Sequence, residues 1–183
     1  IYTAMHGVGT QTLLSVFQEA NFSKPILVEQ QCKPDPDFPT VAFPNPEEPG
    51  AMDLAIKLAI SQNGDLVIAS DPDADRCAVA AQDSAGNWRT LRGDELGILL
   101  GHYISKTEKV AGKTFATTIV SSSALAKIAK NCGADFQETL TGFKYLSKIN
   151  NLAFGYEEAI GYCVNPSKVN DKDGISAALK IAQ

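Results

Sequence analysis

Apolar residues along this chain fall into two patterns. Short continuous apolar runs predict buried β-strands, and apolar positions three or four residues apart predict amphipathic helices. The predicted strands are residues 1–5, 26–28, 65–70, 77–81, 88–91, 114–120, 135–138 and 152–155. The predicted helices are approximately residues 9–20, 51–62, 93–104, 125–132, 143–149 and 174–181. The proline-rich stretch 34–49 predicts a stiff loop with neither helix nor central strand.

The order of these elements predicts the fold class. Each half of the chain runs strand, helix, strand, helix, strand and then an acidic segment, which favours a structural duplication. Residues 77–81 and 88–91 flank a turn-rich stretch and predict a hairpin. We therefore expect an α/β protein with two tandem three-layer α/β/α sandwich domains and mixed, mostly parallel sheets. The expected domains are residues 1–92 and 93–183.

The most informative stretch is residues 71–76, which reads Asp-Pro-Asp-Ala-Asp-Arg directly after a predicted strand. Ligands in open α/β sheets bind at the carboxyl ends of the strands. Alternate residues of an extended loop point the same way, so we expect Asp71, Asp73 and Asp75 to converge. Three carboxylates suit Mg²⁺ and leave room for a phosphate oxygen and water. The guanidinium of Arg76 offers donors to phosphate oxygens.

Two other interpretations compete with a magnesium site. One is a solvated acidic turn with an incidental arginine, which the sequence leaves open. The other is a calcium-binding EF-hand loop, which requires glycine at its sixth position and glutamate at its twelfth. Arg76 and Gln82 occupy those positions, so the EF-hand interpretation fails.

A glycine-containing loop near the start suggests a different function. Gly7 and Gly9 approximate the first two glycines of the dinucleotide-binding pattern, and Glu29 lies near the end of the next predicted strand. Thr12 stands in place of the third glycine. The alternatives are a glycine-assisted tight turn into a helix and a nicotinamide site, so an NAD(P)-dependent oxidoreductase domain remains an alternative function.

A second acidic segment follows the last predicted strand. Glu157 and Glu158 are a pair that can accept hydrogen bonds from two neighbouring sugar hydroxyls, or perform acid–base work. The alternative is a strand-end turn with two solvated acids. Lys144, at the start of a predicted helix, is either a partner for a substrate phosphate or a solvated lysine. Asp94 and Asp173 are expected to be helix N-caps.

Composition limits the classes of partner. The chain has 183 residues, 44% hydrophobic and 20% charged, with a net charge of −5. This charge argues against nucleic acid or an anionic membrane as the main partner but permits a small phosphorylated substrate. No apolar run approaches the ~20 residues of a membrane span. The four cysteines are far apart and include no Cys-x-x-Cys pair, which favours reduced thiols and a cytoplasmic location.

Several segments together resemble one family. Strand-Asp-Pro-Asp-Ala-Asp-Arg is similar to the metal loop of the α-D-phosphohexomutases, the family of phosphoglucomutase and phosphomannomutase. Further resemblances, in chain order, are His-Gly-Val-Gly at 6–9, Gly-Asp-Glu-Leu at 93–96, Thr-Gly-Phe-Lys at 141–144 and Asp-Lys-Asp-Gly at 171–174. The segment 155–162 resembles the branch of phosphoglucomutase/phosphopentomutase and glucose 1,6-bisphosphate synthase. Ala159 replaces the serine usual in the family's sugar-specificity loop.

The resemblance implies reversible movement of phosphate between C1 and C6 of a hexose phosphate, or C5 of a pentose phosphate. The family uses a phosphoserine and a bisphosphate intermediate, so Mg²⁺ and glucose 1,6-bisphosphate are the implied cofactor and activator. The implied site residues are Asp71, Asp73 and Asp75 as metal ligands, Arg76 and Lys144 as catalytic residues, and Glu157 and Glu158 as sugar ligands.

The family's Thr-Ala-Ser-His-Asn-Pro phosphoserine loop does not occur in this sequence. Both ends of the chain also look cut, since it opens in an apolar run and stops inside a predicted helix. We therefore expect the chain to hold the second and third domains of a mutase and to be inactive alone. Its partners would be a sugar phosphate and the first and fourth domains. A non-catalytic module that binds metal or sugar phosphate is the remaining alternative.

Overall fold

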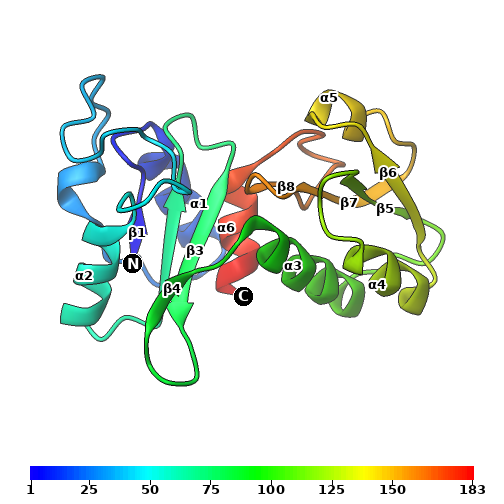
Figure 1. Cartoon of the computed structure of the whole chain (residues 1–183), viewed down its shortest axis with the longest axis horizontal. Helices are drawn as coiled ribbons and strands as arrows, with labels where there is room; N and C mark the ends of the chain where they lie inside the picture. The colour runs from blue at the N-terminus through cyan, green and yellow to red at the C-terminus, as the bar shows by residue number, and fades with distance from the viewer. The chain divides into compact units, whose positions relative to one another are not determined.

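A computed structural model describes all 183 residues, which form two compact units, Ile1–Leu91 and Arg92–Gln183 (Figure 1). Each unit contains one four-stranded sheet together with its own helices. The strand order is β1-β2-β3-β4 in the first unit and β6-β5-β7-β8 in the second. The expectation of two tandem α/β units with mixed sheets is confirmed.

The first unit is a sheet with a parallel side and an antiparallel side. Strand β1 pairs in parallel with β2, whereas β2–β3 and β3–β4 are antiparallel, which confirms the predicted hairpin. Its elements are β1 (Tyr2–Thr3), α1 (Gly9–Glu19), a 3₁₀ helix (Glu29–Gln31), α2 (Asp53–Ser61), β2 (Leu66–Ser70), β3 (Cys77–Gln82) and β4 (Trp88–Thr90). Residues 34–49 contain neither helix nor strand, as their prolines predict.

The predicted strand at 26–28 is wrong. This segment makes one parallel bridge, between Leu27 and Tyr2. The N–H of Tyr2 donates to the Ile26 carbonyl at 2.8 Å, and the N–H of Val28 donates to the Tyr2 carbonyl at 2.9 Å. The chain then turns at once into the 3₁₀ helix, so the ladder cannot continue.

The second unit has helices on both faces of its sheet. Strand β5 pairs in parallel with β6 and with β7, and β7 pairs antiparallel with β8. Figure 1 shows α3 and α4 on one face of this sheet and α5 on the other. The elements are α3 (Gly93–Thr107), β5 (Thr114–Thr118), α4 (Ala124–Cys132), β6 (Asp135–Thr139), α5 (Phe143–Leu146), β7 (Leu152–Glu157), β8 (Gly161–Cys163) and α6 (Gly174–Ala182).

The two predicted N-caps have different outcomes. Asp173 is confirmed, since its Oδ1 accepts from the N–H groups of Ile175 and Ser176 at 3.1 and 3.2 Å, at the start of α6. Asp94 is not a cap, because α3 begins at Gly93, one residue earlier. The first turn of α3 is closed instead by Glu95, whose Oε2 accepts from the backbone N–H of Arg92 at 2.9 Å. The carboxylate of Asp94 is therefore available for partners outside the helix.

Small residues let α3 approach β7 closely. Gly97 lies so near the ring of Tyr156 that an added Cβ would be 2.5 Å from a ring carbon. The ring of Tyr156 is itself stacked between Phe154 and Tyr162, with centroid separations of 6.0 and 6.4 Å. All three aromatic side chains are fully buried. This aromatic row forms the part of the core between α3 and the sheet.

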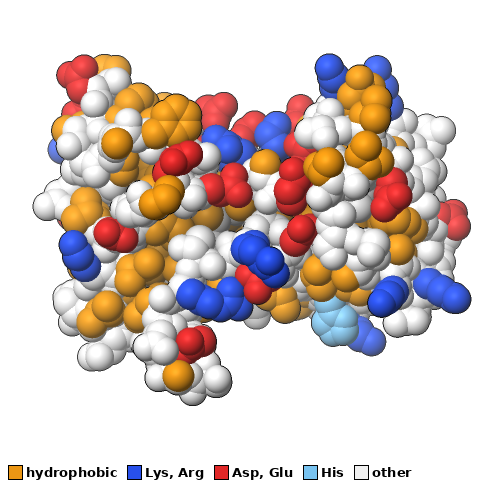
Figure 2. Space-filling model, in the orientation of Figure 1, with side chains coloured by type: hydrophobic (Ala, Val, Ile, Leu, Met, Phe, Trp, Pro, Cys, Tyr) orange, Lys and Arg blue, Asp and Glu red, His pale blue; other side chains and the backbone are white.

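The surface and the helices show two further features. Figure 2 shows acidic and basic side chains interspersed with apolar ones over the visible face of both units, in keeping with a net charge of −5. None of the helices combines the length and the apolar character needed to cross a membrane.

We predict that Gly97→Ala lowers the free energy of unfolding by about 1–3 kcal/mol, because the new methyl group overpacks the contact with Tyr156. Urea denaturation followed by circular dichroism measures this change. Leu99→Ala is the control on the same helix, because Leu99 is 56% exposed and its removal should change stability by no more than about 0.5 kcal/mol. Equal effects of the two substitutions would contradict the packing argument.

Candidate functional site

The acidic stretch 71–76 begins where β2 ends, and it forms a tight turn. The N–H of Ala74 donates to the Asp71 carbonyl at 3.0 Å, and Ala74 itself has a left-handed backbone with φ of 63°. The expectation of an extended loop with alternating side chains is therefore wrong. The carboxylates nevertheless converge, because one oxygen each of Asp71, Asp73 and Asp75 lies within 4.8 Å of the other two.

Arg76 fixes the most buried of these carboxylates. Asp71 is only 3% exposed, and both of its oxygens are bound by Arg76. Its Oδ1 accepts from the Arg76 backbone N–H at 3.0 Å, and its Oδ2 accepts from Arg76 Nε at 2.6 Å. Partial burial alone would lower the pKa of Arg76, but the hydrogen bond to Asp71 and the charges of Asp71 and Asp75 raise it. The guanidinium therefore stays cationic and compensates the buried charge.

The three carboxylates suit a hard divalent cation. Asp71 is buried, Asp75 is half-buried and Asp73 is exposed, so the cluster opens to solvent on one side. Carboxylate oxygens are the preferred ligands of Mg²⁺, which usually keeps several water or phosphate ligands in addition. Three like charges at this separation repel one another, and a bound cation would offset that repulsion. The donor set thus fits the metal that the sequence resemblance implies.

The glycine-containing loop near the start packs against this turn. A Cβ added to Gly7 would lie 2.3 Å from the Cα and the carbonyl oxygen of Pro72. Glu29 lies in a 3₁₀ helix and not at the end of a strand. The close approach of two backbones accounts for this glycine, and the geometry gives the dinucleotide interpretation no support.

The second acidic pair lies in a hairpin. Glu157 is the last residue of β7 and pairs with Gly161, the first residue of β8. It therefore belongs to the sheet, although the sequence predicts that it follows the strand. Only Glu158, Ala159 and Ile160 form the connection, and Ile160 has a left-handed backbone with φ of 55°. Glu157 therefore extends from a strand, whereas Glu158 extends from the connection between the two strands.

Each glutamate has its own partners. Glu157 is 9% exposed, and its Oε1 accepts from the backbone N–H of Gly142 at 2.5 Å. The Oε2 of Glu158 accepts from the hydroxyl of Ser121 at 2.7 Å and from that of Thr118 at 3.2 Å. The N–H of Glu158 donates back to the Ser121 oxygen at 3.0 Å. Neither acid is simply solvated, which is what the alternative interpretation required.

A partly buried contact supports the loop that holds Glu158. The Oδ1 of Asp94 accepts from the backbone N–H of Ser122 at 2.6 Å and from the Tyr156 hydroxyl at 2.9 Å. Burial raises the pKa of Tyr156, and the hydrogen bond to Asp94 raises it further, so the phenol stays a neutral donor. The sequence does not reveal this role of Asp94, because an acid in the first turn of a helix is a typical capping signal.

Two lysines lie near the hairpin in different ways. Lys144 is exposed, with its Nζ 5.2 Å from the centre of the Tyr145 ring, and it follows the Gly142 backbone that binds Glu157. Lys172 was not predicted. Its Nζ lies 5.2 Å from the Phe143 ring centre, and its side chain occupies the space where a Cβ on Gly161 would stand. The Asp-Lys-Asp-Gly segment contains Lys172, but its pattern predicts only the cap at Asp173.

The predicted site residues thus form two groups, one in each unit. Asp71, Asp73, Asp75 and Arg76 come together after β2. Glu157, Glu158 and the 142–144 segment come together around the β7–β8 hairpin.

Two family models match the chain in succession. Residues 1–86 match the model described as phosphoglucomutase/phosphomannomutase, alpha/beta/alpha domain II. Residues 92–183 match domain III of the same description. The chain belongs to the phosphoglucomutase/phosphomannomutase family.

Individual relatives agree with this assignment. A Haemophilus influenzae protein named "Probable phosphomannomutase" is 54% identical over 179 residues, covering 98% of the chain and 37% of the relative. Human phosphopentomutase is 41% identical over 200 residues, covering 100% of the chain and 32% of the relative. The open-form crystal structure of a Paramecium phosphoglucomutase superposes with a TM-score of 0.73 at 26% identity, covering 98% of the chain and 32% of that protein. The chain spans about a third of the length of these relatives.

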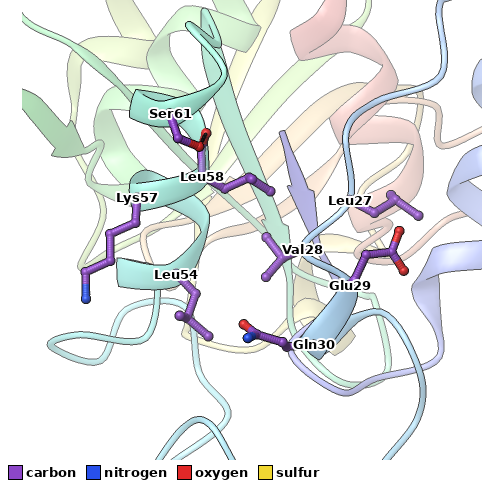
Figure 3. Close-up of a pocket in the computed structure, with 8 residues that line it drawn as sticks. All are labelled: Leu27, Val28, Glu29, Gln30, Leu54, Lys57, Leu58 and Ser61. Carbon is purple, nitrogen blue, oxygen red and sulfur yellow. Dashed lines mark hydrogen bonds between the residues drawn. The ribbon is translucent and has the colours of Figure 1, made fainter.

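A surface groove lies away from the residues of this mutase-family site. It has a volume of about 440 Å³ and runs between the 27–30 segment and α2. Figure 3 shows Val28, Leu54 and Leu58 facing it, while the amine of Lys57 extends away. None of the residues predicted for the mutase site lines this groove. It therefore takes no part in the candidate site.

We predict that Arg76→Ala destabilises the chain by about 1–3 kcal/mol, because the buried Oδ2 of Asp71 loses its guanidinium partner while Oδ1 keeps the backbone N–H. Urea denaturation at neutral pH measures the loss. Arg92→Ala is the matched control, because the Arg92 side chain is 82% exposed and should contribute no more than about 0.5 kcal/mol. An Arg76 variant as stable as the Arg92 variant would mean that Asp71 does not depend on the guanidinium.

Proposed function

We propose that this chain supplies the metal loop and the sugar-binding hairpin of a phosphoglucomutase-type phosphohexomutase. The reaction moves phosphate between C1 and C6 of a hexose phosphate, or C5 of a pentose phosphate. The observation that carries the proposal is the convergence of Asp71, Asp73 and Asp75 after β2, backed by Arg76, in a chain of this family. Phosphoryl transfer needs positioning and charge neutralisation more than covalent chemistry from the protein.

In the first unit, Asp71, Asp73 and Asp75 would hold Mg²⁺. The bound ion would supply positive charge beside the phosphoryl oxygens. Arg76 has two tasks in this proposal. It holds the Asp71 carboxylate in place through its Nε, and it adds a second positive charge to the side where phosphate would bind.

In the second unit, Glu157 and Glu158 would accept hydrogen bonds from sugar hydroxyls. The bonds from Gly142 and Ser121 hold the two carboxylates in fixed orientations before a ligand arrives. Lys144 would balance the charge of the substrate phosphate from the adjoining segment. In the whole enzyme a sugar 1,6-bisphosphate would be the activating intermediate.

The phosphoserine that the family resemblance implies has no matching sequence in this chain. We therefore place the complete activity in a longer protein and expect the 183-residue chain alone to be inactive. Its relatives include proteins named phosphomannomutase and phosphopentomutase, so the preferred sugar must be established by assay.

We predict that the chain binds Mn²⁺ as a probe for Mg²⁺ and that Asp73→Asn weakens binding at least about tenfold, equivalent to ~1.4 kcal/mol. Titration followed by the electron paramagnetic resonance of free Mn²⁺ measures the affinity. Asp135→Asn is the control. Asp135 is an exposed acid in the other unit, and its substitution removes the same charge as Asp73→Asn. Equal affinities of the two variants would show that Mn²⁺ binds outside the cluster.

The activity test uses the full-length protein that contains this chain, with Mg²⁺ and a trace of glucose 1,6-bisphosphate. We predict conversion of glucose 1-phosphate to glucose 6-phosphate in a coupled assay and a loss of at least about a hundredfold in kcat for Asp73→Ala. Glu158→Gln should act mainly by raising KM. The chain alone serves as the negative control. Mannose and ribose phosphates, assayed in parallel, identify the preferred sugar. No turnover of any of the three sugars would leave only a metal- or sugar-phosphate-binding role.

A further inference from the structure

A turn far from the metal loop in sequence makes two backbone contacts with it. Gly7 lies directly against Pro72, and a side chain at Gly7 would overlap the Pro72 backbone. The N–H of Val8 donates to the Pro72 carbonyl at 2.8 Å. Pro72 stands between two of the carboxylates, Asp71 and Asp73, so whatever fixes Pro72 constrains both neighbours. Consecutive Cα atoms are only 3.8 Å apart across a trans peptide bond.

The backbone of this turn is unusual. Met5 and His6 have φ values of 47° and 62°, in the left-handed region that side chains other than glycine rarely adopt. Both residues are buried, at 0% and 4% exposure. Consecutive residues persist in this conformation only where the surrounding structure holds them there. Such backbone strain concentrates at ligand-binding and catalytic sites.

Several hydrogen bonds hold the turn. The N–H of His6 donates to the Gln31 carbonyl at 2.8 Å, and the His6 carbonyl accepts from the N–H of Asp35 at 3.0 Å. The His6 ring Nε2 and the Thr40 hydroxyl are 2.7 Å apart. The same hydroxyl accepts from the Gln31 amide at 2.9 Å, and Gln31 in turn accepts from Thr3 at 2.6 Å. The turn is thus fastened to β1, the 3₁₀ helix and the proline-rich loop.

We propose that residues 6–8 are a positioning element for the metal loop. They hold Pro72 so that the Asp71–Ala74 turn keeps the form in which the carboxylates converge. This inference rests on the proposed metal role of the loop. A metal site requires its ligands to be held within about 0.5 Å of the productive geometry, which a neighbouring rigid backbone can provide. The metal loop is therefore formed by two chain segments, although only one of them carries ligands.

The decisive measurement is amide hydrogen exchange of the metal-free chain, observed by NMR at increasing urea. The reporters are the N–H groups of Val8, Ala74 and Arg76, which donate to Pro72, to the Asp71 carbonyl and to the Asp71 carboxylate. We expect all three to open together, with the same protection and the same dependence on urea. Val8 exchanging independently of the other two amides would overturn the proposal.

Gly7→Ala gives a second test. The substitution should speed exchange at Ala74 and Arg76 at least about tenfold and weaken Mn²⁺ binding several-fold. Gly64→Ala is the matched control, since Gly64 lies before β2, at the opposite end from the metal loop, and an added Cβ meets the Ile1 side chain at 3.1 Å. A folded Gly7→Ala chain with normal exchange at both amides would overturn the proposal.

The two proposals can fail separately. If the wild-type chain does not bind Mn²⁺, the metal role fails, but the exchange measurement still reports whether the turn holds the loop. If Gly7→Ala does not fold, the exchange of the wild-type chain decides the question, because it requires no substitution.

Discussion

The ion pair between the buried Asp71 and the half-buried Arg76 is the constraint on which the metal loop depends. Asp71 is nearly inaccessible to solvent and would be costly to bury as an unpaired charge. Arg76 binds both of its oxygens, one through the backbone and one through the guanidinium. This closes the loop on itself and sets the start and end of the turn. The exposed Asp73 and half-buried Asp75 can then face a cation, because the third carboxylate is already anchored.

In the second unit, the carboxylate of Glu158 is oriented by neutral hydrogen-bond donors instead of a cation. Glu158 is oriented by the hydroxyls of Ser121 and Thr118, and the loop that carries Ser121 is held by Asp94 through the Ser122 N–H. Tyr156 completes this contact as a phenol that burial keeps protonated. A carboxylate that is oriented by hydroxyl groups can accept further hydrogen bonds. The proposed sugar-binding role of Glu158 requires this property.

Both candidate groups lie at the carboxyl end of a strand, β2 in one unit and β7 in the other. This is the edge at which α/β sheets bind ligands, because backbone and side-chain groups converge there without interrupting the core. Both strands lie inside their sheets, with a neighbouring strand on each side. Each unit ends its central strand with acids, but one set is suited to a cation and the other to hydroxyl groups.

The sequence alone determined the family, the strand before the acids, the β3–β4 hairpin and the cap at Asp173, because these depend on local patterns and spacing. It also identified the three aspartates. Only the tertiary structure showed that they converge through a tight turn, that Arg76 is bound to Asp71, and that residues 26–28 form one bridge instead of a strand. The tertiary structure also determined the partners of Asp94 and the contact of Gly7 with Pro72. These last contacts join residues far apart in the chain, and no local pattern encodes which distant backbone will lie within reach.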